Sequence, residues 1–273
     1  MILAISSYGS AVSTTIEKEP AITPQTSELT HTVFAEECTA TWCPNCPFAA
    51  EALYSIYESG DYPFYYVALV HDMNPLAVDR LEDYVLNIFK GFAFPMVYFD
   101  GGDINMVGRG STVEETETMY REIIEEVGAR AVKQPLTLDS TVTWDGNAQI
   151  TVTVDITNDG NFFYLGRIRS YITEIESRWI NNDGNPYHFG FLDFAINKPI
   201  LLLPGQEKTF TATWDGTQTH GNQTFGDITE DNIMVISTIS HWIPHYRIGY
   251  ESEGFTQHYL ARYVDQATSA IPS

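Results

Sequence analysis

The spacing of hydrophobic residues changes once along the chain, near Pro135. Between about residues 31 and 133, short apolar runs alternate with segments whose apolar residues recur at helical spacing. The runs predict strands and the periodic segments predict helices, which indicates an α/β unit. The predicted strands cover 32–38, 62–70, 96–99 and 104–108; the predicted helices cover 47–59, 78–92 and a third segment that begins at Ser111, with Glu114 as its capping partner.

Beyond Pro135 the period falls to two. Ile150, Val152 and Val154 alternate with polar residues, and strand-sized runs are separated by Asp-Gly turns such as Asp145-Gly146. The pattern predicts an all-β sandwich over residues 135–257, followed by a C-terminal tail over 258–273. Because the two halves share no repeat, we expect two different domains, 31–133 and 135–257.

Residues 1–30 show neither the helical spacing of apolar residues nor the period of two that indicates a strand. Residues 1–11 are apolar and then small, as at the end of a signal peptide, but they lack its basic start, and the remainder is rich in Ser, Thr and Pro. We interpret the segment as an N-terminal tether or a residual signal segment. No apolar run is long enough to cross a bilayer, so the sequence predicts no membrane span.

Composition narrows the possible partners. The chain has 273 residues, with 14 Lys and Arg against 36 Asp and Glu, and a formal net charge of −22. Its hydrophobic fraction of 44% excludes a disordered acidic protein. Nucleic acids and anionic membrane surfaces are bound through clustered Lys and Arg, so the net charge disfavours both. Most of the carboxylates that have no basic partner must face solvent, which is typical of a secreted or cell-surface protein or of one from a salty setting. We expect an extracytoplasmic protein, secreted or associated with the cell surface.

All three cysteines lie in one short segment, at Cys38, Cys43 and Cys46. Cys43 and Cys46 form a Cys-x-x-Cys pair between a predicted strand and a predicted helix. The free N–H groups and the positive dipole end of a helix N-terminus stabilise a thiolate on the first cysteine, and the second lies one turn further on, where it can resolve a mixed disulfide. This placement indicates thiol–disulfide chemistry, although zinc ribbons use the same spacing.

The segment Thr39-Ala40-Thr41-Trp42-Cys43-Pro44-Asn45-Cys46 resembles the active-site segment of the thioredoxin superfamily. The resemblance covers roughly residues 31–133 and implies an α/β thioredoxin fold, a central mixed sheet flanked by helices. It implies that Cys43 and Cys46 are catalytic and form a disulfide. It also implies that Glu37, six residues before the first cysteine, accepts the proton of the resolving thiol.

The same resemblance implies a surface that holds an extended protein substrate. Phe94-Pro95 matches the family's cis-proline element, which faces the disulfide, so Trp42, Phe94 and Pro95 are the expected substrate contacts. The loop departs from the family in Pro44 and Asn45, where reducing members carry Gly-Pro and strongly oxidising members carry a His. The direction of electron flow therefore does not follow from the motif.

Two further features bear on the chemistry of the motif. The carboxylates of Glu36, Glu37 and Glu51 are expected to raise the pKa of the Cys43 thiol and so to oppose the helix dipole. Cys38 is interpreted as a small buried hydrophobe. The alternative is a metal site formed by the three cysteines, which would need a fourth ligand such as His31 or His71. We expect neither a metal nor another cofactor.

The C-terminal half carries a second resemblance. A thioredoxin module followed by an Ig-like sandwich is similar to surface proteins related to the Omp-twenty-eight outer-membrane family, in segments such as 203–210 and 231–235. Two functions stay open. The chain is a thiol–disulfide oxidoreductase that acts on protein thiols and disulfides with a redox partner protein, or it is a surface binding or assembly protein in which Cys43–Cys46 is a structural disulfide.

Overall fold

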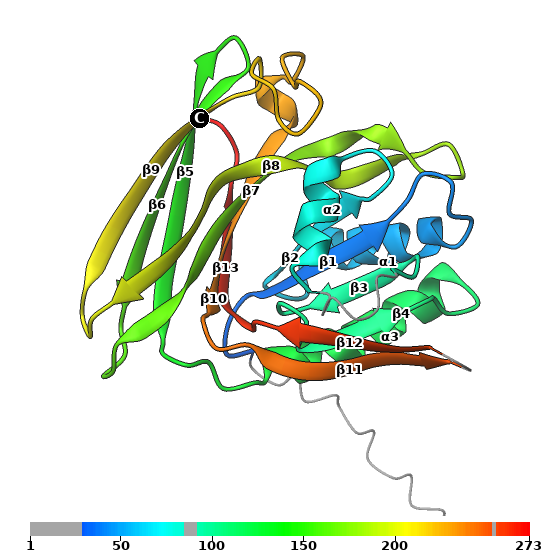
Figure 1. Cartoon of the computed structure of the whole chain (residues 1–273), viewed down its shortest axis with the longest axis horizontal. Coiled ribbons are helices and arrows are strands. Elements are labelled where there is room, and N and C mark those ends of the chain that lie inside the picture. Colours follow the sequence, from blue (N-terminus) through cyan, green and yellow to red (C-terminus); the bar gives the residue numbers. More distant parts are fainter. Residues whose placement is uncertain (1–28, 85–91, 253–254) are drawn as a thin grey trace, which may run out of the picture.

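The computed structural model describes residues 29–84, 92–252 and 255–273. Within these ranges the chain forms three α-helices and thirteen β-strands (Figure 1). Their bounds, in chain order, are β1 (Val33–Thr39), α1 (Cys46–Ser59), β2 (Phe64–Val70), α2 (Pro75–Glu82), β3 (Met96–Phe99), β4 (Ile104–Val107), α3 (Val113–Gly128), β5 (Leu136–Gly146), β6 (Gln149–Asn158), β7 (Tyr164–Ile180), β8 (Pro186–Leu202), β9 (Glu207–Asp215), β10 (Ile233–His241), β11 (His245–Ser252), β12 (Phe255–Ala261) and β13 (Val264–Ala270).

One mixed sheet runs through both halves of the chain. Its strand order is β13-β10-β7-β8-β2-β1-β3-β4. The link between the halves is the parallel pairing of β2 with β8, at Ala68 and Gly190. On one side of this link β2 pairs with β1, and on the other β8 pairs with β7 along nearly its whole length.

This architecture contradicts the predicted fold class. We expected an α/β thioredoxin fold with its own central sheet and a separate Ig-like sandwich, but the protein is mostly β, and strands of the C-terminal half extend the sheet of the N-terminal half. Without β8, the outer edge of β2 would expose unpaired N–H and C=O groups. Hydrophobic periodicity identifies strands but not which of their edges meet, so the pattern could not reveal this junction.

Individual elements were predicted more accurately than their assembly. Strands β1 and β2, helix α1 and the β3–β4 hairpin lie where the pattern predicts them. Helix α2 begins at Pro75, before the predicted start at residue 78, and the rest of the predicted helix includes residues 85–91, which lie outside the described ranges. The segment 1–28, interpreted as part of the tether, also lies outside them.

The N-terminal cap of α3 is one residue further along than predicted. Thr112, and not Ser111, is the N-cap, and its hydroxyl accepts a hydrogen bond from the backbone N–H of Glu115. The Glu115 carboxylate in turn accepts from the backbone N–H of Ser111. These bonds satisfy backbone groups that the first helical turn leaves free.

Helices and strands cover the sheet in different places. Helices α1 and α3 pack together on one face of its β2–β1–β3–β4 part, and α2 lies on the other face (Figure 1). A second core lies between the three-stranded sheet β5-β6-β9 and strands β7, β8 and β10. The β11–β12 ribbon packs beside β4. Residues 258–273, interpreted from the sequence as a tail, supply the end of β12 and all of β13, which pairs with β10.

Candidate active site around the Cys43–Cys46 disulfide

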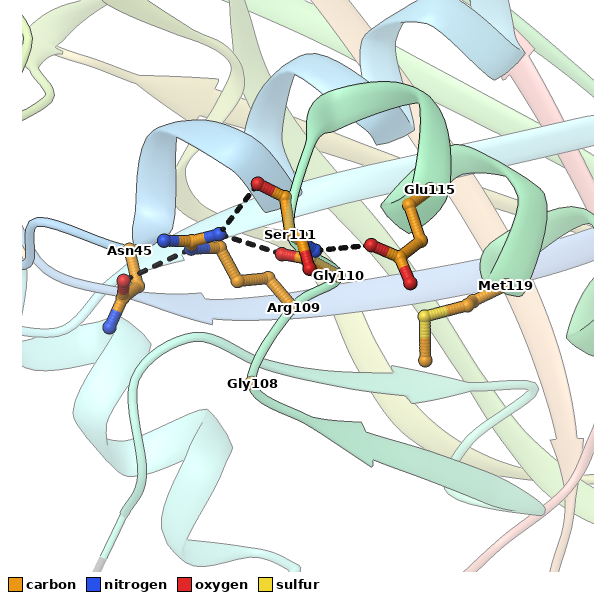
Figure 2. A pocket seen from close by; sticks show the side chains of 7 residues that line it. All are labelled: Asn45, Gly108, Arg109, Gly110, Ser111, Glu115 and Met119. Carbon is orange, nitrogen blue, oxygen red and sulfur yellow. Dashed lines mark hydrogen bonds between the residues drawn. The ribbon is translucent and has the colours of Figure 1, made fainter.

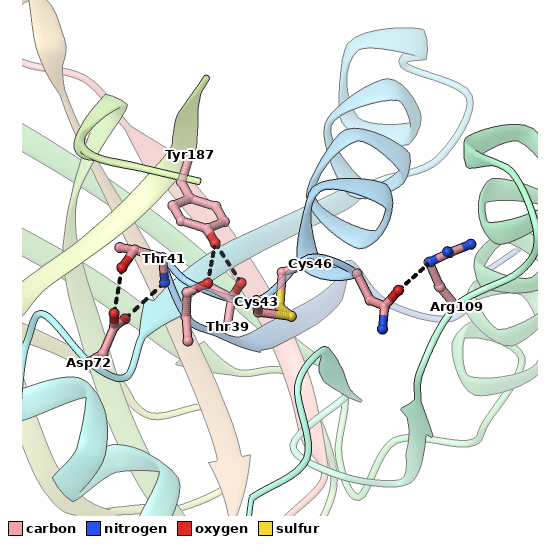
Figure 3. Close-up of a disulfide and its surroundings, with 9 residues drawn as sticks. Thr39, Thr41, Cys43, Cys46, Asp72, Arg109 and Tyr187 are labelled. Carbon is pink, nitrogen blue, oxygen red and sulfur yellow. Dashed lines mark hydrogen bonds between the residues drawn. A yellow bond between two sulfur atoms is a disulfide. The ribbon is translucent and has the colours of Figure 1, made fainter. Parts of the chain in front are cut away.

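Cys43 and Cys46 form a disulfide at the start of α1 (Figure 3). Their Cα atoms are 5.4 Å apart, and Cys46 is the first residue of the helix. Ala40 and Phe94 pack against the pair, leaving Cys43 2% exposed and Cys46 fully buried. The positive end of the α1 dipole therefore faces the disulfide, as the spacing predicts.

The loop that leads to the disulfide is fixed by side chains from two other elements (Figure 3). The Thr39 hydroxyl donates to the Tyr187 hydroxyl over 3.0 Å, and Tyr187 donates to the backbone carbonyl of Ala40, also over 3.0 Å. On the other side, Asp72 accepts from the backbone N–H of Thr41 at 3.0 Å. Sequence reasoning missed Tyr187 of β8 and Asp72, which follows β2, because no local signal marks either residue as a neighbour of this loop.

Replacing Tyr187 with Phe is expected to destabilise the protein by about 1 kcal/mol, because the Thr39 hydroxyl and the Ala40 carbonyl lose a buried partner. The measurement is the free energy of unfolding in urea. Tyr120→Phe is the matched control, since the Tyr120 hydroxyl is buried without a hydrogen bond to any described residue and its removal should cost nothing. An equal effect of the two variants would contradict a specific role for Tyr187.

Aromatic side chains lie next to the disulfide. Trp42 is 60% exposed and contacts Phe94 edge-on, with ring centroids 5.4 Å apart. The Phe94–Pro95 peptide bond is cis, as the family resemblance implies. His71 packs on the other side of Phe94 at 5.2 Å, and burial lowers the pKa of its imidazole despite the opposing charge of Asp72. The residues expected to hold a substrate therefore lie together, with Trp42 open to solvent.

Glu37 lies fully buried on β1, two residues before the end of the strand. Among the residues that the structure describes, neither carboxyl oxygen has a hydrogen-bond partner. Burial raises the pKa of Glu37 to about 8, although the nearby Thr39 hydroxyl lowers it somewhat. The Thr39 hydroxyl donates its hydrogen to the Tyr187 hydroxyl, and so it makes no hydrogen bond to the Glu37 carboxyl. Glu37 therefore carries a proton near neutral pH and can exchange it there.

The other two carboxylates of the predicted acidic surroundings are placed differently. Glu36 lies next to Glu37 on β1, so its side chain is on the opposite face of the sheet, where Arg80 donates to both of its oxygens at 2.7 and 2.6 Å. Tyr171 also donates to it, at 2.9 Å. Glu51 is exposed on α1. The charge of Glu36 is thus compensated, which weakens the expected upward shift of the thiol pKa.

A basic side chain that sequence reasoning missed lies beside the motif. Arg109 follows β4 and donates from Nε to the Asn45 side-chain oxygen at 3.0 Å, and its guanidinium stacks on Phe48 with 3.7 Å to the ring centroid. It makes no ion pair with a carboxylate among the described residues. Figure 2 shows it at the wall of a hollow of about 470 Å³, lined by Asn45, Gly108, Arg109, Gly110, Ser111, Glu115 and Met119.

Replacing Arg109 with Gln is expected to raise the pKa of the Cys43 thiol in the reduced protein by about half a unit, because an unpaired positive charge beside the motif favours the thiolate. The measurement is the pH dependence of Cys43 alkylation. Arg121→Gln is the control: Arg121 is paired with Asp61 and Glu117 on the surface. If both variants alkylate with the wild-type pH profile, Arg109 only supports the loop.

The structure places Cys38 in the core. Cys38 is fully buried on β1, and burial followed by the neighbouring Glu37 raises the pKa of its thiol. His31, one of the two candidate fourth ligands, is bonded to Asp100 at 2.5 Å. Across residues 29–84, 92–252 and 255–273, no group of three or more Cys, His, Asp or Glu is arranged to hold a metal ion.

Comparison with known proteins adds information about the fold. No family model matches the chain, and no curated protein matches it in sequence. Among solved structures, HBP35 of Porphyromonas gingivalis is similar, with a TM-score of 0.59 and 14% identity over 90% of this chain and 78% of that one. A protein from Agrobacterium tumefaciens has a TM-score of 0.49 and 13% identity over 90% of this chain and 97% of its own. At this identity the likeness to HBP35 shows a shared fold alone, so function has to be argued from the site.

Proposed function

We propose that the protein is a thiol–disulfide oxidoreductase that acts on protein disulfides through Cys43 and Cys46. The observation that carries the proposal is the Cys43–Cys46 disulfide at the N-terminus of α1, beside the exposed Trp42. Trp42, Phe94 and Pro95 would hold an extended segment of the substrate, and Pro44 and Asn45 complete the loop between the cysteines. A redox partner protein would restore the starting oxidation state.

The exchange proceeds in two balanced steps. In the reduced protein, the Cys43 thiolate attacks one sulfur of a substrate disulfide, and the other substrate sulfur leaves as a thiolate. Cys46 then loses its proton and attacks Cys43, which releases the second substrate sulfur and forms the Cys43–Cys46 disulfide. Two electrons pass to the substrate. The reverse sequence oxidises a substrate dithiol, and the same residues serve both directions.

Glu37 is the proposed proton acceptor for Cys46. Because burial raises its pKa to about 8, the carboxyl exchanges its proton in the pH range where a thiol also titrates. It can supply the proton that Cys46 needs when the disulfide opens and take it back when Cys46 attacks. Its position near the end of strand β1, which leads directly into the loop, supports this role.

We place the protein outside the cytoplasm, secreted or associated with the cell surface. Stable disulfides persist in oxidising compartments, and the charge of −22 suits an exposed, soluble surface. In the part of the chain that the structure covers, no helix is long and apolar enough to cross a membrane.

The proposed exchange is tested by trapping its intermediate. Cys46→Ser should form a stable mixed disulfide between Cys43 and a disulfide-containing protein substrate, identified by mass spectrometry, whereas Cys43→Ser should not. Cys38→Ala is added to both variants so that only one thiol of the motif remains in each. If Cys43 never forms a mixed disulfide after reduction, the exchange mechanism is wrong.

A second function is favoured by one specific observation: Cys43 is only 2% exposed and Cys46 is fully buried. Such burial suits a structural disulfide in a surface binding or assembly protein. The reduction potential separates the two candidates, because structural disulfides have potentials below about −300 mV and catalytic couples lie above this value. We therefore expect a measured potential above this limit for the oxidoreductase and below it for the structural alternative.

A further inference from the structure

Three loops at one end of the β-rich half expose large apolar side chains together. They are the β6–β7 loop (159–163), the β8–β9 loop (203–206) and the β10–β11 loop (242–244), which lie toward the lower end of strands β6 to β10 in Figure 1. Seven of the fourteen large apolar side chains that are exposed in the described ranges lie in these loops or in the strand ends beside them. We call them the loop-end patch: Phe162, Phe163, Leu165, Leu201, Leu203, Trp242 and Ile243.

The members of the loop-end patch are neighbours in space. The Asn158 side chain donates to the backbone carbonyls of Phe162 and Leu203, at 2.8 and 3.3 Å, which holds the first two loops together. Leu165 pairs directly with Leu201 across β7 and β8. The backbone N–H of Trp242 donates to the Leu165 carbonyl at 3.0 Å, which adds the third loop. The patch is thus continuous.

Basic residues lie near the loop-end patch, although the chain as a whole is acidic. The three lysines of the described ranges are all in the loops or strands beside it. Lys133 lines a hollow of about 320 Å³ with Phe163, Leu165 and Trp242. Lys208 donates to the Leu201 carbonyl at 2.7 Å. Lys198 lies on β8 three residues before Leu201, with its ammonium group 4.4 Å from the centre of the Phe210 ring. The carboxylates in these loops and in the strands beside the lysines are Asp155, Asp159 and Glu207. The large excess of carboxylates that the whole chain carries is therefore absent from this end.

We propose that the loop-end patch docks the protein on a phospholipid surface. Exposed aromatic and aliphatic residues at loop tips, ringed by lysines, are typical of membrane interfaces: the apolar groups enter the headgroup region and the ammonium groups reach lipid phosphates. Protein–protein interfaces are instead depleted in Lys. The net charge does not oppose this contact strongly, because carboxylates more than about 8 Å away are largely screened at physiological salt.

Docking in this way would orient the disulfide. Strand β7 begins at the loop-end patch and runs 17 residues, about 55 Å at roughly 3.3 Å per residue. At its far end, Asp183 and Asn185 of the β7–β8 turn line a small hollow with Pro47 and Phe48 of α1. Cys43–Cys46 would therefore point away from the lipid surface. This inference does not depend on the proposed redox function.

The test is co-sedimentation of the full chain with vesicles of phosphatidylcholine, with and without an equal amount of phosphatidylglycerol. We expect binding to both, stronger with phosphatidylglycerol and weakened by salt. Phe162→Ser with Phe163→Ser should lower the partition coefficient at least about tenfold. Lys198→Gln with Lys208→Gln should weaken only the binding that phosphatidylglycerol adds.

Ile180→Ser with Ile271→Ser is the matched control, because both side chains are exposed, Ile180 at the far end of β7 and Ile271 next to Ala270, which pairs near the start of β10. This variant should bind vesicles as the wild type does. The proposal is overturned if the wild type binds neither vesicle, or if the control loses as much binding as the double Phe variant. It is also overturned if light scattering shows self-association that the double Phe variant abolishes, without vesicle binding, since the patch would then be a protein interface.

Discussion

Glu37→Gln is expected to stabilise the protein by about 3 kcal/mol near pH 7. Burial raises the pKa of Glu37 from its ordinary value of 4.5 to about 8, and neither oxygen has a hydrogen-bond partner within residues 29–84, 92–252 and 255–273. Between these two values the unfolded chain releases the proton while the folded protein retains it, which costs about 1.4 kcal/mol per pH unit. Gln is neutral at every pH and keeps the shape of the side chain, so the cost disappears.

The sign of the pH dependence is specific. A group whose folded-state pKa is raised contributes most stability below its unfolded pKa, and loses it as the pH rises to the folded value. Wild type and Glu37→Gln should therefore be similar near pH 4, and the variant should gain steadily until about pH 8. Urea unfolding of the oxidised protein across this range measures the difference. Glu51→Gln, at an exposed position of α1, should show no such gain.

The same variant tests the proposed role of Glu37 in exchange. Without an ionisable carboxyl, the second step, in which Cys46 resolves the mixed disulfide, should slow and lose its dependence on a group with a pKa of about 8. The first step, attack by Cys43, should not change. A variant that is more stable but resolves mixed disulfides at the wild-type rate would leave Glu37 as a buried acid without a catalytic role.

Glu36→Gln is expected to have the opposite effect on stability, a loss of about 3–5 kcal/mol, because it leaves the Arg80 guanidinium buried without its compensating charge. Arg80 and Glu36 are both at most 5% exposed, and two bonds join them directly. Tyr84 and Tyr171 also donate to the carboxylate. The measurement is again the free energy of unfolding in urea.

The double variant Glu36→Gln with Arg80→Met is the control for this interpretation. Removing both charges leaves no uncompensated group, so the double variant should be more stable than Glu36→Gln alone. If the two substitutions instead add their separate costs, the loss comes from packing around the side chains and not from the buried charge.

The contrast between Glu36 and Glu37 shows what could be predicted from the sequence. The strand and its alternation place the two carboxyls on opposite faces of β1. What each carboxyl meets there depends on residues distant in the chain: Arg80 and Tyr171 on one side, Tyr120 and Tyr187 on the other. The sequence could therefore indicate a buried acid at Glu37, but not that the negative charge of Glu36 is compensated by Arg80.

Local patterns by themselves determined the Cys-x-x-Cys pair at the start of a helix, the neighbouring strands, and the small buried Cys38. These features depend on residues a few positions apart, and so they can be read from spacing. Only the tertiary structure decided that the two halves share one sheet, that Tyr187 and Arg109 lie beside the disulfide, and that three loops form the loop-end patch. The local sequence of a strand edge or an exposed loop does not indicate which segment will lie beside it, because almost any residue can take part in backbone pairing. The packing of the whole chain determines which edges and loops meet.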